Sequence, residues 1–322
     1  MNMQDNSAGV LEIHQEYSGH YKMEVIRAAT GKREDLTDWQ DNLITDYALE
    51  AIGGIPNEGI DLQYLSSWLR AVGVGTSAVP PAVTDVTFGA FNAETATTNS
   101  TARGFTTVAP FYAWYRSEFQ FSPAAAEVNL AELGLFNNQI QTRKLITHAL
   151  IKDAQGNPTT VTLLTGDILV LTYEIRCYAR TTDVVKTQTI KGVEQTFTIR
   201  PSMLGTSEAG EASATILWSS YPWGGYWYLN GQGVGPSTGK PSGAESMYTS
   251  YQLVTQAYTP NSKYRDVVVR LGINDAIDAT ITGFRSLSAA VQYQLGITPG
   301  VPKTADEIVN LTLRMSWGRY TP

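Results

Sequence analysis

The sequence predicts an all-β protein, built as two tandem, related antiparallel β-sandwich domains with one short helix near residues 45–53. Three observations predict this class. Short segments that alternate apolar and polar residues recur along the chain, separated by turns rich in Gly, Pro, Asn and Asp. Aromatic residues make up 10% of the chain and 28 of its 322 residues are glycine, as is typical of strands joined by tight turns. Only one segment has a clear helical pattern.

The chain begins with a polar segment, residues 1–16, for which we expect a flexible N-terminal arm. The first strand is predicted at His20–Ala28, because Tyr21, Met23 and Val25 fall on one face of an alternating pattern. The turn residues at 30–32 end this strand.

The helix is predicted within residues 42–53. Thr45 or Asp46 can accept hydrogen bonds from the free N–H groups of its first turn, and Gly53 can adopt the left-handed conformation that ends a helix. A helix of about two turns is marginal by itself, so packing has to stabilise it.

The rest of the first half contains further strands and turns. A loop rich in Thr and Asn is expected at residues 95–101, and a turn at Asp153–Pro158. The last predicted strand pair is broken at Gly166–Asp167. The predicted strand regions are residues 66–76, 105–121, 145–152 and 159–180.

One strand pattern occurs twice. Asp167–Cys177 is echoed 140 residues later by Glu307–Trp317, with matching apolar faces, preceding turns and following aromatic and Arg residues. Any two amphipathic strands align to some degree, but strand order agrees here as well. We therefore predict a first sandwich at 17–183, which docks to a larger particle, and a second at 184–322 with a Gly/aromatic loop at 219–245.

Charge and cysteine content exclude several classes of function. Charged residues are only 16% of the chain and the net charge is −7, which argues against a nucleic-acid partner. No basic leader precedes an apolar segment, and no apolar run is long enough to insert in a membrane. With one cysteine, Cys177, and three histidines, we expect no metal site and no bound cofactor.

Motifs for catalysis are weak, and we expect no enzymatic activity. The glycines from Gly231 to Gly239 fit neither a phosphate loop nor a dinucleotide motif, and we expect a flexible surface loop there. His148 alternates with apolar residues and is expected to be a packed imidazole. A glycan hydrolase would need an acidic pair at the right separation, and the candidate pairs are Glu127 with Glu132 and Asp275 with Asp278.

An aromatic cluster supplies the candidate contact residues. Exposed rings in a Gly-rich loop can contact another subunit or stack on a sugar, whereas buried rings would close the end of their own sandwich. The sequence leaves these three interpretations open. The residues are Tyr221, Trp223, Tyr226, Trp227 and Tyr228.

Residues 20–180 resemble virion proteins of tailed bacteriophages of the kind labelled as tail-fibre, collar or minor structural components. The resemblance is carried by several motifs in order: Trp39–Leu49, Val72–Thr76 with Pro80–Asp85, Asn129–Phe136, Ala149–Pro158 and Ile168–Arg176.

The resemblance implies a non-enzymatic structural component present in multiple copies in the tail, collar or baseplate. Its partners would be itself and other virion proteins, and it would be made in the host cytoplasm and located in the virion. Low charge fits a surface that is covered by neighbouring subunits. The alternatives are a tail-fibre adsorption protein that binds a host receptor or surface glycan through Trp223, Tyr226 and Trp227, and a capsid decoration protein.

Overall fold

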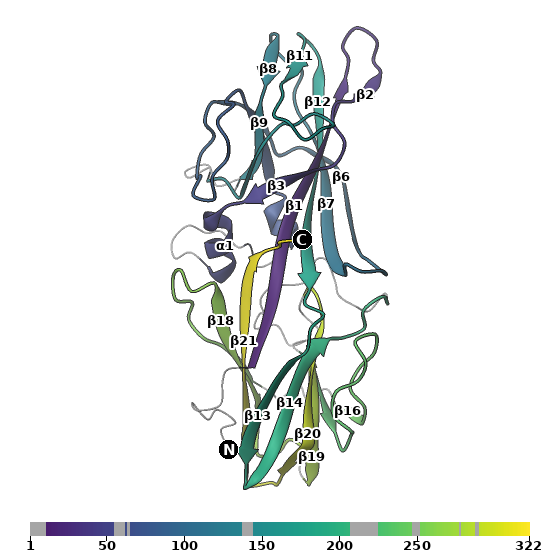
Figure 1. Cartoon of the computed structure of the whole chain (residues 1–322), viewed down its shortest axis with the longest axis vertical. Coiled ribbons are helices and arrows are strands. Elements are labelled where there is room, and N and C mark those ends of the chain that lie inside the picture. Colours follow the sequence, from purple (N-terminus) through teal and green to yellow (C-terminus); the bar gives the residue numbers. More distant parts are fainter. Residues whose placement is uncertain are drawn as a thin grey trace. The chain divides into compact units, whose positions relative to one another are not determined.

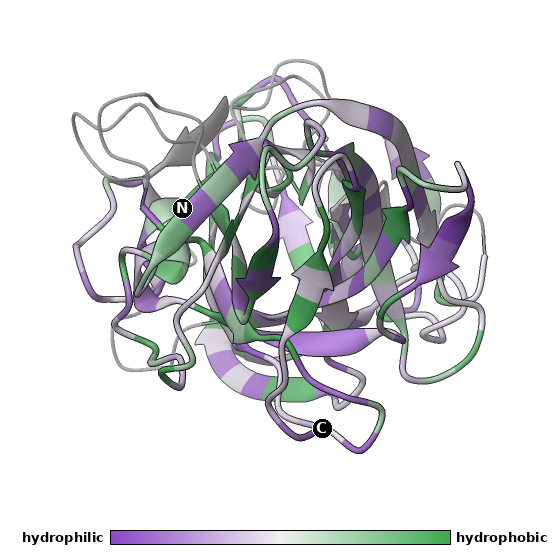
Figure 2. Ribbon diagram, turned by 90° about the horizontal axis from the view of Figure 1, so that it is seen from above, coloured by the Kyte–Doolittle hydropathy of each residue, from purple (hydrophilic) through white to green (hydrophobic). Residues whose placement is uncertain are grey.

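The computed structural model describes residues 11–54, 62, 65–136, 144–206, 225–246, 252–276, 278–286 and 290–322. These residues form antiparallel strands and two short helices (Figure 1), so the predicted all-β class is confirmed. Hydrophobic and hydrophilic residues alternate along many strands (Figure 2). Such alternation is the pattern of strands with one face on a core.

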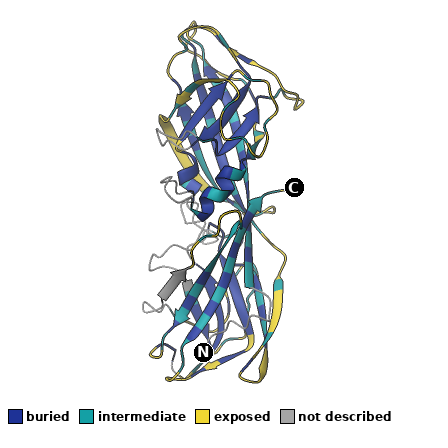
Figure 3. Ribbon diagram, turned by 90° about the vertical axis from the view of Figure 1, so that its left-hand side faces the viewer, coloured by how far each residue is buried: buried dark blue, intermediate teal, exposed yellow. Residues whose placement is uncertain are grey.

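The chain divides into two compact units that interleave in sequence. Unit 1 comprises residues 1–16, 105–113 and 177–318, and unit 2 comprises residues 17–104, 114–176 and 319–322. These units differ from the contiguous segments 17–183 and 184–322 expected from the sequence. The predicted kinship of the two halves stays a prediction. Each unit has its own buried interior (Figure 3).

The expectation of a flexible arm is wrong for its described part. Strand β1 (Leu11–Ile26) already begins at Leu11, and residues 1–10 lie outside the described residues. Ile13 and Gln15 are buried while His14 is half-buried. The alternation of buried and half-buried residues runs from Ile13 to Tyr17, but the polar Gln15 occupies one of the buried positions, so the hydrophobic pattern is interrupted there.

Unit 1 is a two-layer sandwich. One layer consists of β17 (Gln252–Thr255), β18 (Tyr264–Leu271), β21 (Val309–Arg319) and the start of β1. Ile13 and Leu313 from this layer and Ile199, Phe284 and Leu295 from the other surround a gap too small for a water molecule, so the two inner faces meet there. The second layer contains, in spatial order, β13 (Val184–Ile190), β14 (Val193–Pro201), β20 (Tyr293–Lys303), β19 (Ala279–Ser286), β15 (Gly225–Leu229) and β16 (Ala244–Ser246).

Unit 2 is a strongly curled sheet. The Thr95 hydroxyl donates to the Gln120 carbonyl, and the Gln120 N–H donates to Thr97. These bonds join the connection between β5 and β6 to the end of β7. β2 (Arg33–Asp35) pairs with β1, and β8 (Val128–Leu130) pairs with β11 (Val161–Leu163). The main order is β6 (Thr98–Phe105), β7 (Tyr112–Gln120), β12 (Ile168–Ala179), β1, β3 (Gln40–Ile44), β10 (Thr147–Leu150), β9 (Glu132–Phe136), β4 (Ala71–Gly75) and β5 (Phe91–Thr95).

The predicted helix is present as α1 (Asp46–Gly53). The Thr45 side chain accepts a hydrogen bond from the Ala48 N–H at 3.1 Å, as its N-cap role requires. The left-handed end was predicted one residue too early, because Gly54, with φ of 94°, takes that conformation.

Two other local predictions were wrong. The region predicted as a strand from residue 66 begins with helix α2 (Leu65–Trp68), and β4 starts only at Ala71. The expected loop at residues 95–101 belongs largely to β5 and β6, where the Asn99 side chain donates to Gln120 on β7. Thr and Asn favour turns, but pairing with a neighbouring strand overrides that local preference.

Candidate binding site

The site in unit 2 begins with two glycines on β4. Gly73 and Gly75 lie on the same face, since they are two residues apart on a strand. A Cβ on Gly73 would lie 2.8 Å from ring carbons of Phe88, and a Cβ on Gly75 would lie 2.3 Å from Glu132 Oε1. Because neither glycine has a side chain, the Phe88 ring can pack over Gly73 and the Glu132 carboxylate can lie over Gly75.

Glu132, on β9, has no exposed surface. Its carboxylate accepts backbone hydrogen bonds from Ala90 at 2.7 Å and Gly89 at 3.1 Å. The Thr76 N–H donates to the Ala90 carbonyl at 2.8 Å. Glu132 thus ties down the end of the loop at residues 76–90, which connects β4 to β5.

His148, on β10, links Glu132 to the middle of the same loop. Its Nε2 lies 2.8 Å from Glu132 Oε2 and its Nδ1 lies 2.8 Å from Asp85 Oδ2. A neutral imidazole has one N–H and ionised carboxylates only accept. Both hydrogen bonds therefore require an imidazolium ring or a proton on one carboxyl group. The Ala82 N–H also donates to Asp85, at 2.7 Å.

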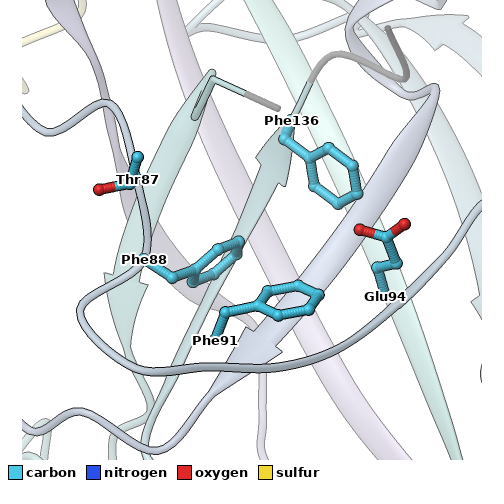
Figure 4. Close-up of a pocket in the computed structure, with 5 residues that line it drawn as sticks. All are labelled: Thr87, Phe88, Phe91, Glu94 and Phe136. Atoms are coloured by element: carbon cyan, nitrogen blue, oxygen red, sulfur yellow. The ribbon is translucent and has the colours of Figure 1, made fainter. Parts of the chain in front are cut away.

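A recess opens beside this network, and we call it the phenylalanine recess. Figure 4 shows the rings of Phe88, Phe91 and Phe136 around it, with the Glu94 carboxylate beside Phe136. Its volume is about 270 Å³, and Thr87 is a further lining residue in the described part of the chain. The Phe88 and Phe91 ring centroids are 5.7 Å apart. Phe91 is 47% exposed. Aromatic walls suit an apolar organic group.

The arrangement does not suit metal binding. The two carboxylates meet opposite nitrogens of the His148 ring, so the three groups do not converge on one point. Within the described parts of the chain, no group of three or more His, Cys, Asp or Glu side chains could hold a metal ion. His148 is 4% exposed and acts as a packed imidazole, as expected from the sequence.

In each acidic pair considered for hydrolysis, one carboxylate is buried and holds a loop. Glu132 holds the 76–90 loop, whereas Glu127 is exposed. Asp275 is buried and accepts the Gly272 N–H at 2.8 Å. Asp278 lies in a turn with φ of 56°. The buried carboxylates Glu132 and Asp275 therefore have identified roles in holding loops.

The predicted aromatic contact residues separate into two groups. Tyr221 and Trp223 lie outside the described residues, and Tyr226, Trp227 and Tyr228 belong to β15. Trp227 and Tyr228 have no exposed surface, so their assignment as partner contacts is wrong. β15 pairs with β19 on one side and β16 on the other, which the Gly-rich surroundings did not indicate.

Their contacts are internal to unit 1. The Trp227 ring packs against Phe284 with centroids 5.2 Å apart, and the Tyr228 hydroxyl donates to Glu245 at 2.7 Å. Tyr226 is half-buried with its ring 5.3 Å from the Arg285 guanidinium. For Trp227 and Tyr228, the self-packing interpretation is the one that the structure supports.

The segment at 219–245 is not one loop. Its described part starts with β15, and β16 begins at Ala244. The glycines between them are not in a flexible loop as expected, because hydrogen bonds hold their backbone. The Gln294 side chain accepts from the Gly235 N–H and donates to Pro236, both at 2.8 Å, and the Gly231 N–H donates to Thr282 at 3.0 Å.

Strand β6 forms an open edge of unit 2. Among the described residues it pairs only with β7, and its first six residues, Thr98–Arg103, are exposed. The strand contains no proline, and Arg103 is its one charged residue. A strand edge of this length presents unpaired backbone groups for pairing with another chain.

Comparison with known proteins gives no relative: no protein-family model, curated protein or solved structure matches this chain. In the described part of the chain, neither helix has the length and apolar character of a membrane span.

Proposed function

We propose that this protein is a non-enzymatic structural component of a tailed-phage virion that assembles in multiple copies in the tail, collar or baseplate. The observation that supports assembly best is the open edge at β6. Natural proteins usually protect edge strands with charges, proline, bulges or short length. β6 has eight residues and one charge.

The edge has a direct chemical use. A second strand placed beside β6 would satisfy its outward backbone N–H and C=O groups, which is how strand addition gives affinity without large pockets. The low charge of the chain, 16%, also fits a surface covered by neighbouring subunits. The part of the proposal that names a phage virion as the larger assembly is based on the sequence resemblance alone.

The adsorption alternative has less support. It relied on Trp223, Tyr226 and Trp227, and the Trp227 ring is buried inside unit 1. Adsorption and capsid decoration are therefore treated as outcomes of the experiment below.

The experiment compares assembly and location. Light scattering after gel filtration should show that the purified chain forms oligomers, and that Thr101→Lys on β6 weakens association by roughly 10-fold, because a charge protects an edge. Thr159→Lys is the matched control, since Thr159 is an exposed threonine of unit 2 outside β6. Immunogold labelling of virions should place the protein in the tail.

Three results would count against the proposal. A monomer at about 100 µM that is absent from purified virions contradicts it. Label over the capsid shell would indicate decoration, and a block of host adsorption by the free protein would indicate a receptor-binding role.

A further inference from the structure

We propose that a proton on His148 acts as a pH-sensitive latch that holds residues 82–86 of the 76–90 loop. The latch is the hydrogen-bonded chain of Glu132, His148 and Asp85. With the proton present, both carboxylates bind the ring and the loop is held. Once rising pH removes the proton, the bond to Asp85 is lost. All of these residues belong to unit 2, and the latch is independent of the assembly proposed above.

The proton lies on the ring, because the oxygen atoms that face it already accept backbone N–H groups. Glu132 Oε2 lies 2.8 Å from His148 Nε2 and also accepts the Gly89 N–H at 3.1 Å. Asp85 Oδ2 lies 2.8 Å from Nδ1 and also accepts the Ala82 N–H at 2.7 Å. An oxygen that carried its own proton would be a poor acceptor for a second donor. Both ring nitrogens therefore donate, and the imidazolium is bound between two carboxylates.

The groups around the ring come from two strands and the loop. β9 contributes Glu132, and the loop contributes Asp85 and the Phe88 ring, which packs edge-on. β3 places Leu43 opposite His148 in the strand pairing. Within the described residues, the two carboxylates are thus the titratable groups that are bonded to the ring.

Two other charged groups lie near the loop, and each has its own partner. Asp46 donates its N–H to the Val83 carbonyl at 2.7 Å, while its carboxylate lies 2.6 Å from the Arg319 guanidinium. The Lys144 ammonium lies 4.9 Å from the centre of the Tyr47 ring. Proton exchange at the latch therefore changes the charge of the loop mainly where Asp85 meets the ring.

Loss of the proton breaks the bond to Asp85 and leaves the bond to Glu132. A neutral imidazole donates through one nitrogen. The Glu132 side chain has no exposed surface, so leaving it unpaired is costly, whereas the Asp85 side chain is 28% exposed and water can solvate it. The lone pair on Nδ1 of His148 then faces the Asp85 carboxylate with no proton between them, and two acceptors 2.8 Å apart repel each other.

The segment that this repulsion loosens is the middle of the loop, residues 82–86. Its backbone is attached to the sheet by the N–H groups of Asp46 and Leu145, which donate to two of its carbonyls at 2.7 and 3.1 Å. Both bonds weaken when the Asp85 side chain moves away from the ring. The end of the loop stays attached, because its bonds to Glu132 do not require the ring proton.

The test combines two NMR measurements on the full chain between about pH 5 and about pH 9. Long-range proton–nitrogen correlation shows whether each ring nitrogen of His148 carries a proton. Hydrogen exchange, corrected for its intrinsic pH dependence, gives the protection of the Asp46, Leu145 and Ala90 amides. As the ring loses its proton, protection at Asp46 and Leu145 should fall roughly 10-fold while Ala90, which is bonded to Glu132, stays unchanged.

Asp85→Asn separates the latch from a general effect of pH. The amide can accept from a charged ring and donate to a neutral one, so a hydrogen bond to His148 survives on both sides of the titration. Protection of the loop should therefore lose its pH dependence. His20→Gln is the matched control, because His20 is the other histidine of unit 2 and is bonded to Ser18 and Asp41. It should leave the pH dependence unchanged.

Any of four results would overturn the latch. The ring could carry a single proton at every pH while the loop is protected, or keep both protons over the whole range. Alternatively, the ring could lose its proton with no fall in protection at Asp46 and Leu145, or Asp85→Asn could keep the full pH dependence. None of these measurements involves β6, so their failure leaves the proposed function untouched.

Discussion

At the scale of single residues, His148 links the 76–90 loop to strand β9. It connects a fully buried carboxylate, Glu132, to Asp85 on the loop. We predict that His148→Phe lowers the free energy of unfolding by about 3 kcal/mol, because it leaves the buried Glu132 carboxyl group without its side-chain partner. Urea unfolding at pH 7 measures this change.

A double-mutant cycle provides the control. Glu132→Gln already removes the carboxyl group that His148 contacts, so His148→Phe added to it should be less costly than in the unchanged protein. Strictly additive effects of the two changes on the free energy of unfolding would show that His148 and Glu132 do not stabilise each other.

Glu307 illustrates a pH-dependent contribution in unit 1. The Lys191 ammonium, 2.5 Å away, and the Thr304 N–H lower the pKa of its carboxyl group to about 2. A lowered pKa stabilises the fold above the ordinary value near 4.3, and this stabilisation is lost as the pH falls toward 2.

We therefore predict that Glu307→Gln destabilises the protein by at most about 1 kcal/mol at pH 7, since the pair is partly exposed and screened by solvent. The difference between variant and unchanged protein should shrink as the pH falls from 5 to 2. Thermal unfolding at several pH values tests this, and a pH-independent difference would contradict it.

At the scale of elements, β4 shows how a strand makes room for a site. A Cβ at Gly75 would lie 2.3 Å from Glu132 Oε1 and 2.6 Å from the Ala90 carbonyl oxygen. We predict that Gly75→Ala costs about 2 kcal/mol, because the loop and the carboxylate have to shift. Gly318→Ala on β21 is the control, since its Cβ would make only an ordinary contact at 3.6 Å. Chemical denaturation of both variants measures the difference, and equal stability of the two would refute this reading of β4.

Elements also show where sequence reasoning succeeded. The strand carrying Tyr21, Met23 and Val25 was predicted because alternation with polar residues is strong, and all three side chains have no exposed surface. α1 was predicted because capping is local. β5 and β6 were missed because their Thr- and Asn-rich sequences form strands only through pairing with β4 and β7.

The candidate site was missed for a related reason. Gly73 and Gly75 alternate with valine, which indicates that one face of the strand has no side chains. The sequence does not show which groups pack against that face. Phe88 and Phe91 come from the following loop and strand, and Phe136 comes from β9 much later in the chain. His148 was correctly predicted to be packed, while its two carboxylate partners depend on tertiary contacts.

At the scale of the whole molecule, each unit is assembled from separated segments. Unit 1 needs residues from β1, because Ile13 lies with Leu313 between its two layers, and the Tyr293 hydroxyl donates to the His14 carbonyl at 3.2 Å. We predict that a fragment of residues 184–322 does not fold cooperatively, since it lacks this strand. Circular dichroism melting and amide NMR dispersion test it against the full chain. A sharp melt with dispersed resonances would show that the contiguous segment is sufficient.

By itself, the sequence determined the all-β class, the faces of strands with strong alternation such as that of Tyr21, Met23 and Val25, and the short capped helix, because alternation, turn residues and caps act within a few neighbouring residues. Tertiary structure alone decided that Trp227 and Tyr228 are buried, that Glu132 and His148 hold a loop, and that three phenylalanines form a recess. These features depend on strand pairings between distant segments, and no local pattern encodes which segments will meet.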